Sequence, residues 1–175
     1  MLFRSRILST GTYLDSLRFR FHLARRLGVS PACVDAQIVG ERGTTEVFLW
    51  SSAGIAGNPI TGLLAKSAQD REELCREIER EVRYANITII DGIGASQHGI
   101  GMVCARIAEI VLRDERAVIP IGSFNSRYGV TLSLPSILGR RGVTQVLEPE
   151  MSEDERQALR RSAEALSAAG ARIKI

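Results

Sequence analysis

The segment GTYLDSLRFR, residues 11–20, decides how the rest of the chain is interpreted. Thr12 is of a type that caps helices, and Asp15, three positions later, completes a capping-box-like pattern. We therefore expect a helix from about Tyr13 to Leu27, ended by Gly28. Apolar residues at helical spacing predict its buried face: Leu14, Leu17, Phe21 and Ala24.

The same segment carries an acid and a base three residues apart. Asp15 and Arg18 should share one face of the predicted helix and can form an ion pair. Taken alone, such a pair is most often exposed, and it contributes at most about 1 kcal/mol to stability. By itself, the segment therefore indicates structure rather than chemistry.

A second segment, GERGTTEVFLWS at residues 40–51, places two glycines around a charged pair. The stretches 34–39 and 46–50 have the composition of strands, and the glycine-containing turn lies between them. Alone, this pattern is typical of a hairpin turn.

The downstream sequence predicts further helices and strands. In order, they are helices at about 68–90 and 96–112, strands at 118–121, 129–134 and 143–147, and a helix at about 152–168. The stripe of the first helix comprises Leu74, Ile78, Val82 and Ala85. The second helix is more apolar and should be more deeply buried. Ser152 and Glu155 form a capping box at the start of the last helix. Because regular βαβ alternation is missing, we predict one α+β domain over residues 1–175, with a largely antiparallel sheet packed with long helices.

The composition indicates a globular domain without a strong overall charge. The net charge is +3, from 23 basic and 20 acidic residues, and this small excess is spread along the chain. It gives little support to a nucleic-acid or membrane partner. No apolar run reaches the roughly 18 residues needed to span a bilayer, and the first residues lack a hydrophobic signal core. We expect a cytoplasmic protein.

The three cysteines, Cys33, Cys75 and Cys104, are odd in number and widely spaced, which does not suggest a disulfide framework. With only two histidines in the chain, no zinc-ligand spacing appears, and no metal site is expected. We interpret the cysteines as buried, reduced thiols.

The segment richest in glycine is GIGASQHG at residues 92–99. It lacks the third glycine of the dinucleotide fingerprint and the Gly-Lys-Ser/Thr ending of a P-loop. We therefore expect no cofactor-binding residues in this chain.

Taken together, the two segments at 11–20 and 40–51 resemble the L-lactate/malate dehydrogenase family, in both their motifs and their separation. The resemblance extends over about Phe3 to Ala168, including VSP at 29–31, LSLPSILG at 132–139 and LEPEMS at 147–152. It corresponds to the C-terminal, substrate-binding half of the family. The resemblance implies that half's α+β fold, without the N-terminal Rossmann domain that binds NAD in a full-length relative.

The resemblance also implies roles for individual residues. Arg18 matches the arginine that grips the substrate carboxylate, and Asp15 matches the aspartate that orients the catalytic residue. Ser96 matches a small hydroxyl residue that lines the substrate pocket. The implied ligand is a small 2-hydroxy or 2-oxo carboxylate, and the implied assembly is a homo-oligomer.

The main departure from the family is Arg42, which stands where the family has its catalytic histidine. Proton exchange needs a group that titrates near the working pH. Arginine stays protonated because its pKa is above about 12, so it can polarise a carbonyl but is a very poor base. A second departure is Asp35, which replaces a histidine of relatives that a sugar bisphosphate activates. Arg20 would still fit that site, but an anion at Asp35 would repel phosphate.

Three functional hypotheses remain open from the sequence. The chain can be part of an NAD-dependent 2-hydroxy-acid dehydrogenase that is inactive in isolation. It can be a non-catalytic descendant that binds small carboxylates through Arg18 and Arg42. It can also be an oligomerisation module derived from the family.

Overall fold

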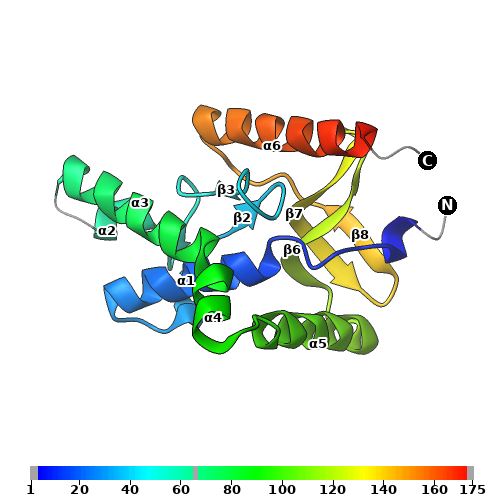
Figure 1. The fold of residues 1–175 in the computed structure, drawn as a ribbon, viewed down its shortest axis with the longest axis horizontal. Helices are drawn as coiled ribbons and strands as arrows, with labels where there is room; N and C mark the ends of the chain where they lie inside the picture. Colours follow the sequence, from blue (N-terminus) through cyan, green and yellow to red (C-terminus); the bar gives the residue numbers. More distant parts are fainter. Residues whose placement is uncertain (1–3, 65–66, 173–175) are drawn as a thin grey trace.

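The computed structural model of the chain describes residues 4–64 and 67–172 (Figure 1). Its main sheet is antiparallel, with the strand order β6-β7-β8. β6 spans Ala117–Asn125, β7 spans Val130–Gly139 and β8 spans Gly142–Val146. β6 and β7 pair in one continuous register along the whole of β6, which makes this ladder the most regular part of the fold.

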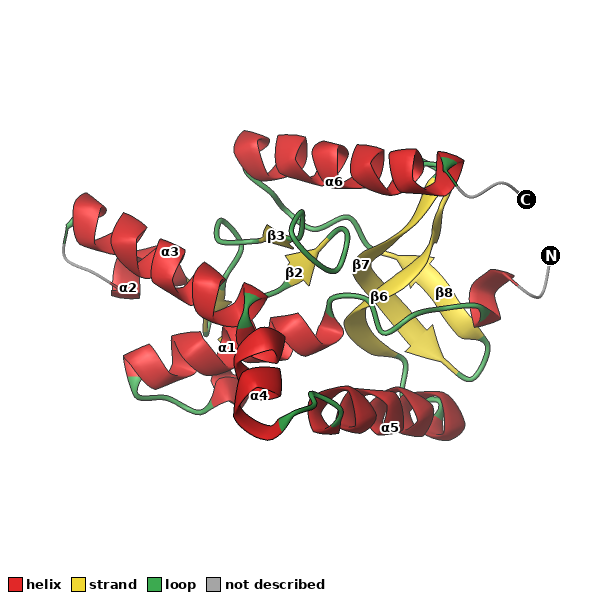
Figure 2. Ribbon diagram, in the orientation of Figure 1, coloured by secondary structure: helices red, strands yellow, loops and turns green. Residues whose placement is uncertain are grey.

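Two long helices lie on either side of this sheet (Figure 2). α5 spans His98–Arg113, and its Ile110 shares a core cluster with Ile121 of β6. α6 spans Glu153–Ala171, and its Leu159 packs in a separate cluster with residues of β7. Each helix buries one apolar stripe against the sheet, as expected for amphipathic helices.

The other half of the molecule is built from helices and very short strands. Its elements are α1 (Tyr13–Leu27), β1 (Val34–Asp35), β2 (Ile38–Val39), β3 (Val47–Phe48), β4 (Gly54–Ile55), β5 (Asn58–Pro59), α2 (Ile60–Leu64), α3 (Ala68–Arg83) and α4 (Ala85–Ile93). A 3₁₀ helix at Pro31–Cys33 also belongs to this half, whereas the 3₁₀ helix at Arg4–Arg6 lies against β8 of the main sheet. The strands pair antiparallel in the orders β1-β4-β5 and β2-β3. Phe19 and Leu23 of α1 form the core here, with Phe48 and Ile78.

Several sequence predictions are confirmed. The fold is α+β with antiparallel sheets, and α1 has the expected bounds. The capping box at the start of α6 is present, with both the Ser152 and the Glu155 side chains bonded to backbone N–H groups. The three strands of the main sheet lie where they were expected, although β6 and β7 are longer than predicted.

The predicted details of α1 are wrong in two respects. The Thr12 side chain does not cap the helix, because its hydroxyl donates instead to the carbonyl of Ile38. Leu17 and Phe21 are exposed rather than buried. The buried face carries Ser16, Phe19 and Leu23. The buried stripe is therefore rotated relative to the predicted one. It includes the polar residue Ser16, whose hydroxyl accepts a hydrogen bond from the backbone N–H of Ile38.

Other boundaries also differ from the predictions. The single helix expected at 68–90 is divided at Tyr84 into α3 and α4. The strand expected at 34–39 is two strands, because the chain changes partner within it: β1 pairs with β4, and β2 pairs with β3. The β4–β5 hairpin and α2 were not predicted.

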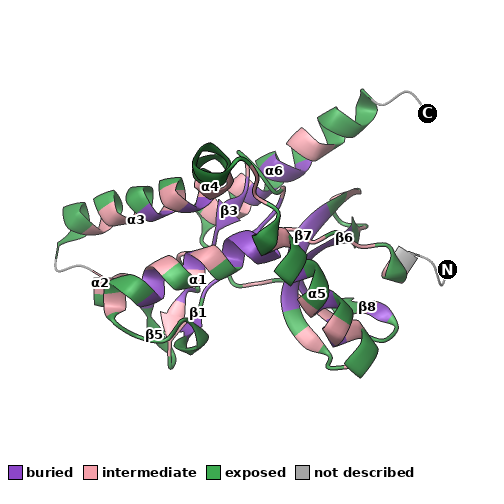
Figure 3. Ribbon diagram, turned by 60° about the horizontal axis from the view of Figure 1, so that its bottom comes forward, coloured by how far each residue is buried: buried purple, intermediate pink, exposed green. Residues whose placement is uncertain are grey.

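Burial differs from the predictions at the cysteines and along α5. Cys33 and Cys104 are exposed and Cys75 is half-buried, so the expected burial of the thiols is wrong. α5 is buried only along one face, and Met102 and Leu112 are exposed (Figure 3). Cys104 lies on the exposed side of α5, away from its buried stripe of Val103, Ile107 and Ile110. Among the described residues, no helix combines the length and hydropathy that crossing a membrane requires.

Candidate active site

Ser133, on β7 of the main sheet, forms hydrogen bonds to both of the motifs identified in the sequence. Its backbone N–H donates to the carbonyl of Gly40 at 2.9 Å, and its carbonyl accepts from the N–H of Gly40 at 2.8 Å. Its hydroxyl oxygen accepts from the backbone N–H of Thr12 at 3.1 Å and is also bonded to the Thr12 hydroxyl at 2.9 Å. The segments at 11–20 and 40–51 are therefore held to the same point of the sheet.

Each motif begins with a glycine that no other residue could replace without strain. Gly11 has φ +53°, and a Cβ there would lie 2.5 Å from the Ser133 hydroxyl. Gly40 has φ +89°, and a Cβ there would lie 2.6 Å from the Ser162 hydroxyl. Positive φ and close approach both favour glycine, so these positions fix how the motifs leave the sheet.

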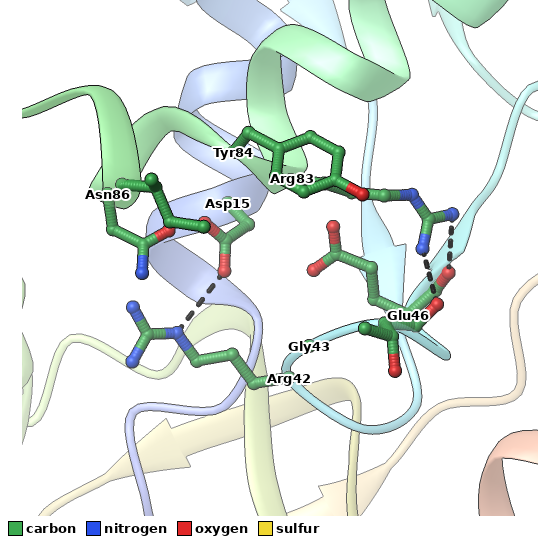
Figure 4. Close-up of a pocket in the computed structure, with 9 residues that line it drawn as sticks. Asp15, Arg42, Gly43, Glu46, Arg83, Tyr84 and Asn86 are labelled. Atoms are coloured by element: carbon green, nitrogen blue, oxygen red, sulfur yellow. Dashed lines mark hydrogen bonds and ion pairs between the residues drawn. The ribbon is translucent and has the colours of Figure 1, made fainter.

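The two motifs meet at Asp15, a buried carboxylate on the first turn of α1. Arg18 donates from Nη1 to Asp15 Oδ1 at 2.9 Å. Arg42 donates from Nε to Asp15 Oδ2 at 3.3 Å, a contact that is visible in Figure 4. The predicted proximity of Arg42 to Asp15 is therefore confirmed. Hydrogen bonds from two guanidinium groups, one to each oxygen, keep this side chain oriented.

A cavity of about 350 Å³ opens beside Asp15. It is lined by Asp15, Arg42, Gly43, Thr44, Glu46, Arg83, Tyr84, Asn86 and Ile87. Its volume suits a small organic ligand, and its lining mixes charged, polar and apolar groups. Figure 4 shows the Arg42 guanidinium beside the Asp15 carboxylate and facing Asn86, and the Glu46 carboxyl turned into the cavity.

Arg83, at the end of α3, holds the loop that carries Arg42. Its Nη1 donates to the carbonyl of Thr44 at 2.7 Å, and its Nη2 donates to the carbonyl of Glu46 at 3.1 Å. The guanidinium also lies over the ring of Phe48, 5.0 Å from its centroid. The planar fork of arginine suits this double contact, and the loop is thereby fixed to the helix that forms the opposite wall.

Glu46 is the most unusual member of the cavity lining. It is only 4% exposed, and burial raises its pKa to about 8. The negative charge of Asp15 adds to this shift, whereas Arg83, Arg42 and Arg18 oppose it. Sequence reasoning missed Glu46, although one signal was present: a carboxylate begins an otherwise apolar strand, VFLW at 47–50.

Two residues singled out from the sequence do not line the cavity. Ser96 is half-buried in the connection between α4 and α5. Arg18 reaches the cavity only through Asp15. The sequence did not predict the four lining residues at the junction of α3 and α4, which are Arg83, Tyr84, Asn86 and Ile87. Arg20 is engaged by the protein itself, since its Nε donates to the carbonyl of Ala36 at 2.8 Å and its Nη2 lies 3.9 Å from Asp35.

The described residues contain neither the strand-to-helix setting of a dinucleotide fingerprint at 92–99 nor a cluster of metal-ligand side chains. The glycine segment at 92–99 connects two helices, whereas a dinucleotide fingerprint connects a strand to a helix whose N-terminus receives the pyrophosphate. Within 4–64 and 67–172, no group of three or more His, Cys, Asp or Glu side chains could hold a metal ion.

Comparison with known proteins agrees with this geometry. A family model described as lactate/malate dehydrogenase, alpha/beta C-terminal domain, matches residues 12–174. L-lactate dehydrogenase from Thermus aquaticus is 42% identical over 177 residues, an alignment that covers 96% of this chain and 56% of that protein. The enzyme of the same name from Deinococcus radiodurans is 41% identical over 158 residues, covering 90% of this chain and 52% of that protein.

A solved structure shows the same fold. The crystal structure of the minor L-lactate dehydrogenase from Enterococcus mundtii, in its ligands-bound form, matches with a TM-score of 0.90 and 32% identity. The match covers 98% of this chain and 56% of that one. The chain thus spans about half the length of the relatives it matches. With the matched motifs held around one buried aspartate, the chain belongs to the lactate/malate dehydrogenase family and corresponds to that family's α/β C-terminal domain.

Proposed function

We propose that this domain binds small 2-oxo and 2-hydroxy carboxylates in the cavity beside Asp15, as the substrate-binding half of an NAD-dependent L-2-hydroxy-acid dehydrogenase. The observation that carries the proposal is the placement of Arg42. It lines the cavity and bonds Asp15 through Nε alone, while its two terminal nitrogens make no hydrogen bond to any described residue. Those donors are available to a carboxylate or carbonyl oxygen.

The proposal includes Arg18 because this residue matches the arginine with which the family binds the substrate carboxylate. It is half-buried beside Asp15 and donates to it, so the two arginines and the carboxylate form one charged group with a net positive charge. An anionic ligand that enters the cavity would compensate that charge. Asp15 would keep both guanidinium groups aligned.

Arg42 determines which chemistry the domain contributes. It supplies a fixed positive charge that can bind and polarise an oxygen, and it does not cycle between protonation states. The described residues do not fit a dinucleotide, so hydride chemistry would depend on NAD held by another domain. The chain alone should therefore show no turnover of lactate or malate.

Calorimetric titration with oxamate tests this proposal. Oxamate carries a carboxylate next to a carbonyl and does not react. Arg42→Ala should weaken its affinity by about tenfold or more, because a charge-assisted hydrogen bond is lost. Arg160→Ala, which removes an exposed arginine on α6 outside the cavity lining, is the matched control. Absence of oxamate binding by the wild-type chain, or equal affinity in both variants, would contradict the proposal.

A second candidate function, oligomerisation, is favoured by the exposure of α4. None of its residues is buried, and its apolar side chains Ile87, Ile89, Ile90 and Ile93 are exposed. Exposed apolar surface of this kind favours association. We expect a dimer in light scattering at dilute concentration, and a persistent monomer would argue against this candidate.

A further inference from the structure

Glu46 is a buried carboxyl group without a partner. Its Oε1 is shielded from solvent and has no hydrogen-bond partner, and the group forms no ion pair with the described residues. Burying an unpaired carboxylate costs a free energy of roughly several kcal/mol, so such a group is protonated or has a ligand as its partner. Glu46 lines the cavity, so a ligand there could reach it.

Burial is the main reason why Glu46 retains its proton, and the charged groups around it modify this effect. α1 contributes Asp15 and Arg18, the loop contributes Arg42, and α3 contributes Arg83. Asp15 already accepts hydrogen bonds from two guanidinium groups, and Arg83 donates from Nη1 and Nη2 to backbone carbonyls. Among the described residues, none of these cations forms a hydrogen bond or an ion pair with the Glu46 carboxyl, and burial raises its pKa.

The direction of the side chain favours a role in the cavity over a purely structural one. In Figure 4 the Glu46 carboxyl points into the space between Asp15 and Arg83. Its backbone carbonyl, by contrast, is held by Arg83. The main chain is thus anchored while the acid group stays unbonded and faces the ligand space.

We propose that Glu46 is the proton-carrying group of this cavity, and that its neutral carboxyl donates a hydrogen bond to an oxygen of a bound 2-oxo carboxylate. The inference rests on the proposed function and deepens it. Residue 42 would provide a fixed charge, and residue 46 would provide the exchangeable proton that arginine cannot supply. No covalent step is involved, because the proton stays on Glu46 while the ligand is bound.

Charge considerations give the pH dependence of this arrangement. With Glu46 neutral, an anion entering the cavity meets Arg42, Arg18 and Arg83 against Asp15 alone. When Glu46 ionises, its charge repels the anion and its hydrogen bond is lost. Ligand affinity should therefore be constant at low pH and fall once Glu46 loses its proton. Binding above that point should take up one proton per ligand.

The experiment is a calorimetric titration of the wild-type chain with oxamate between about pH 6 and about pH 10, in two buffers of different ionisation enthalpy. We expect the affinity to decline by up to about tenfold per pH unit above about pH 8, with proton uptake approaching one. Glu46→Gln should still bind oxamate, without the decline and without proton uptake. Glu41→Gln makes the same side-chain substitution in the same loop, outside the cavity lining, and should behave like wild type.

Each remaining outcome decides between the two proposals. Oxamate binding that is independent of pH in the wild type, or proton uptake that persists in Glu46→Gln, overturns the assignment of Glu46 and leaves the proposed function intact. Failure of the wild type to bind oxamate at any pH overturns both. Carbon-13 detection of the side-chain carboxyls gives an independent result, because titration of Glu46 near its usual value of about 4.3 would also overturn the assignment.

Discussion

The main-sheet half of the molecule and the half that carries the site differ in how their backbone groups are hydrogen-bonded. In the main sheet, β6 and β7 bond each other backbone to backbone over the full length of β6. In the half that carries the site, strands of two residues leave many backbone groups to be bonded by side chains. Arg83 bonds the carbonyls of Thr44 and Glu46, and Ser16 accepts from the N–H of Ile38 at 2.9 Å.

This difference shows where single substitutions can move the site. A backbone ladder survives most changes of side chain, because its donors and acceptors belong to the main chain. A loop held by side chains loses its position when one of them is removed. The cavity lies in the second kind of structure, so its geometry depends on a small number of polar side chains that bond the backbone around it.

Both halves depend on apolar packing, and the loss of this packing should have the largest effect on the free energy of unfolding. Ile121 of β6 is fully buried, and Ile121→Ala should lower the free energy of unfolding by about 2–5 kcal/mol, because it leaves a cavity. Urea denaturation measures this loss. Val118→Ala, at a half-exposed position on the same strand, is the control and should cost less than about 1 kcal/mol. Equal losses in the two variants would contradict the prediction.

The next largest effect should come from Glu46 and should depend on pH. Its pKa in the folded chain is about 8, above the unfolded value of about 4.3, so the unfolded chain releases the proton first. The contribution to stability is present below about pH 4 and is lost as the pH rises to about 8.

We expect wild type to lose about 2–4 kcal/mol of unfolding free energy between pH 5 and pH 9 through this group, and Glu46→Gln to lack that loss. Urea denaturation at both pH values measures the difference. A parallel decline in wild type and variant would show that Glu46 titrates normally.

The contrast between the halves also explains what the sequence could predict. The bounds of α1, the capping box at Ser152 and the strands of the main sheet follow from local patterns, and they are found. The partner exchange within 34–39 and the break at Tyr84 depend on contacts between distant segments, so periodicity could not indicate them.

The residues of the site can likewise be divided into those that the sequence predicted and those that it missed. The proximity of Asp15 and Arg42 followed from a motif separation that matched the family. Glu46 was missed because its importance lies in burial without a partner, which no spacing of residue types reveals. Leu17 and Phe21 were assigned to the core because hydrophobic periodicity takes no account of a buried polar residue such as Ser16.

Two buried serines on β7 provide a direct test of the distinction between the halves. Ser133 bonds Thr12 of the site half, whereas Ser136 donates only to the carbonyl of Leu134 in its own strand, at 2.9 Å. Ser133→Ala should cost about 1–3 kcal/mol, because it leaves the buried N–H of Thr12 unbonded, and it should also weaken oxamate binding. Ser136→Ala should cost about 1 kcal/mol or less and leave binding unchanged. Chemical denaturation and calorimetry measure both effects, and a reversal of this order would contradict the prediction.

The smallest effect on stability, and the sharpest on geometry, should come from Arg83→Lys. A lysine ammonium keeps the charge but lacks the planar fork that reaches the carbonyls of Thr44 and Glu46 together. We expect a loss of about 0.5–1 kcal/mol in unfolding free energy and an oxamate affinity about threefold to tenfold weaker, with faster amide exchange across 43–46. Arg80→Lys, at an exposed position three residues earlier on α3, should change none of these quantities. If Arg83→Lys binds oxamate as tightly as wild type, the pairing of β2 with β3 is enough to hold the loop. The site half would then be maintained by its backbone, as the main sheet is.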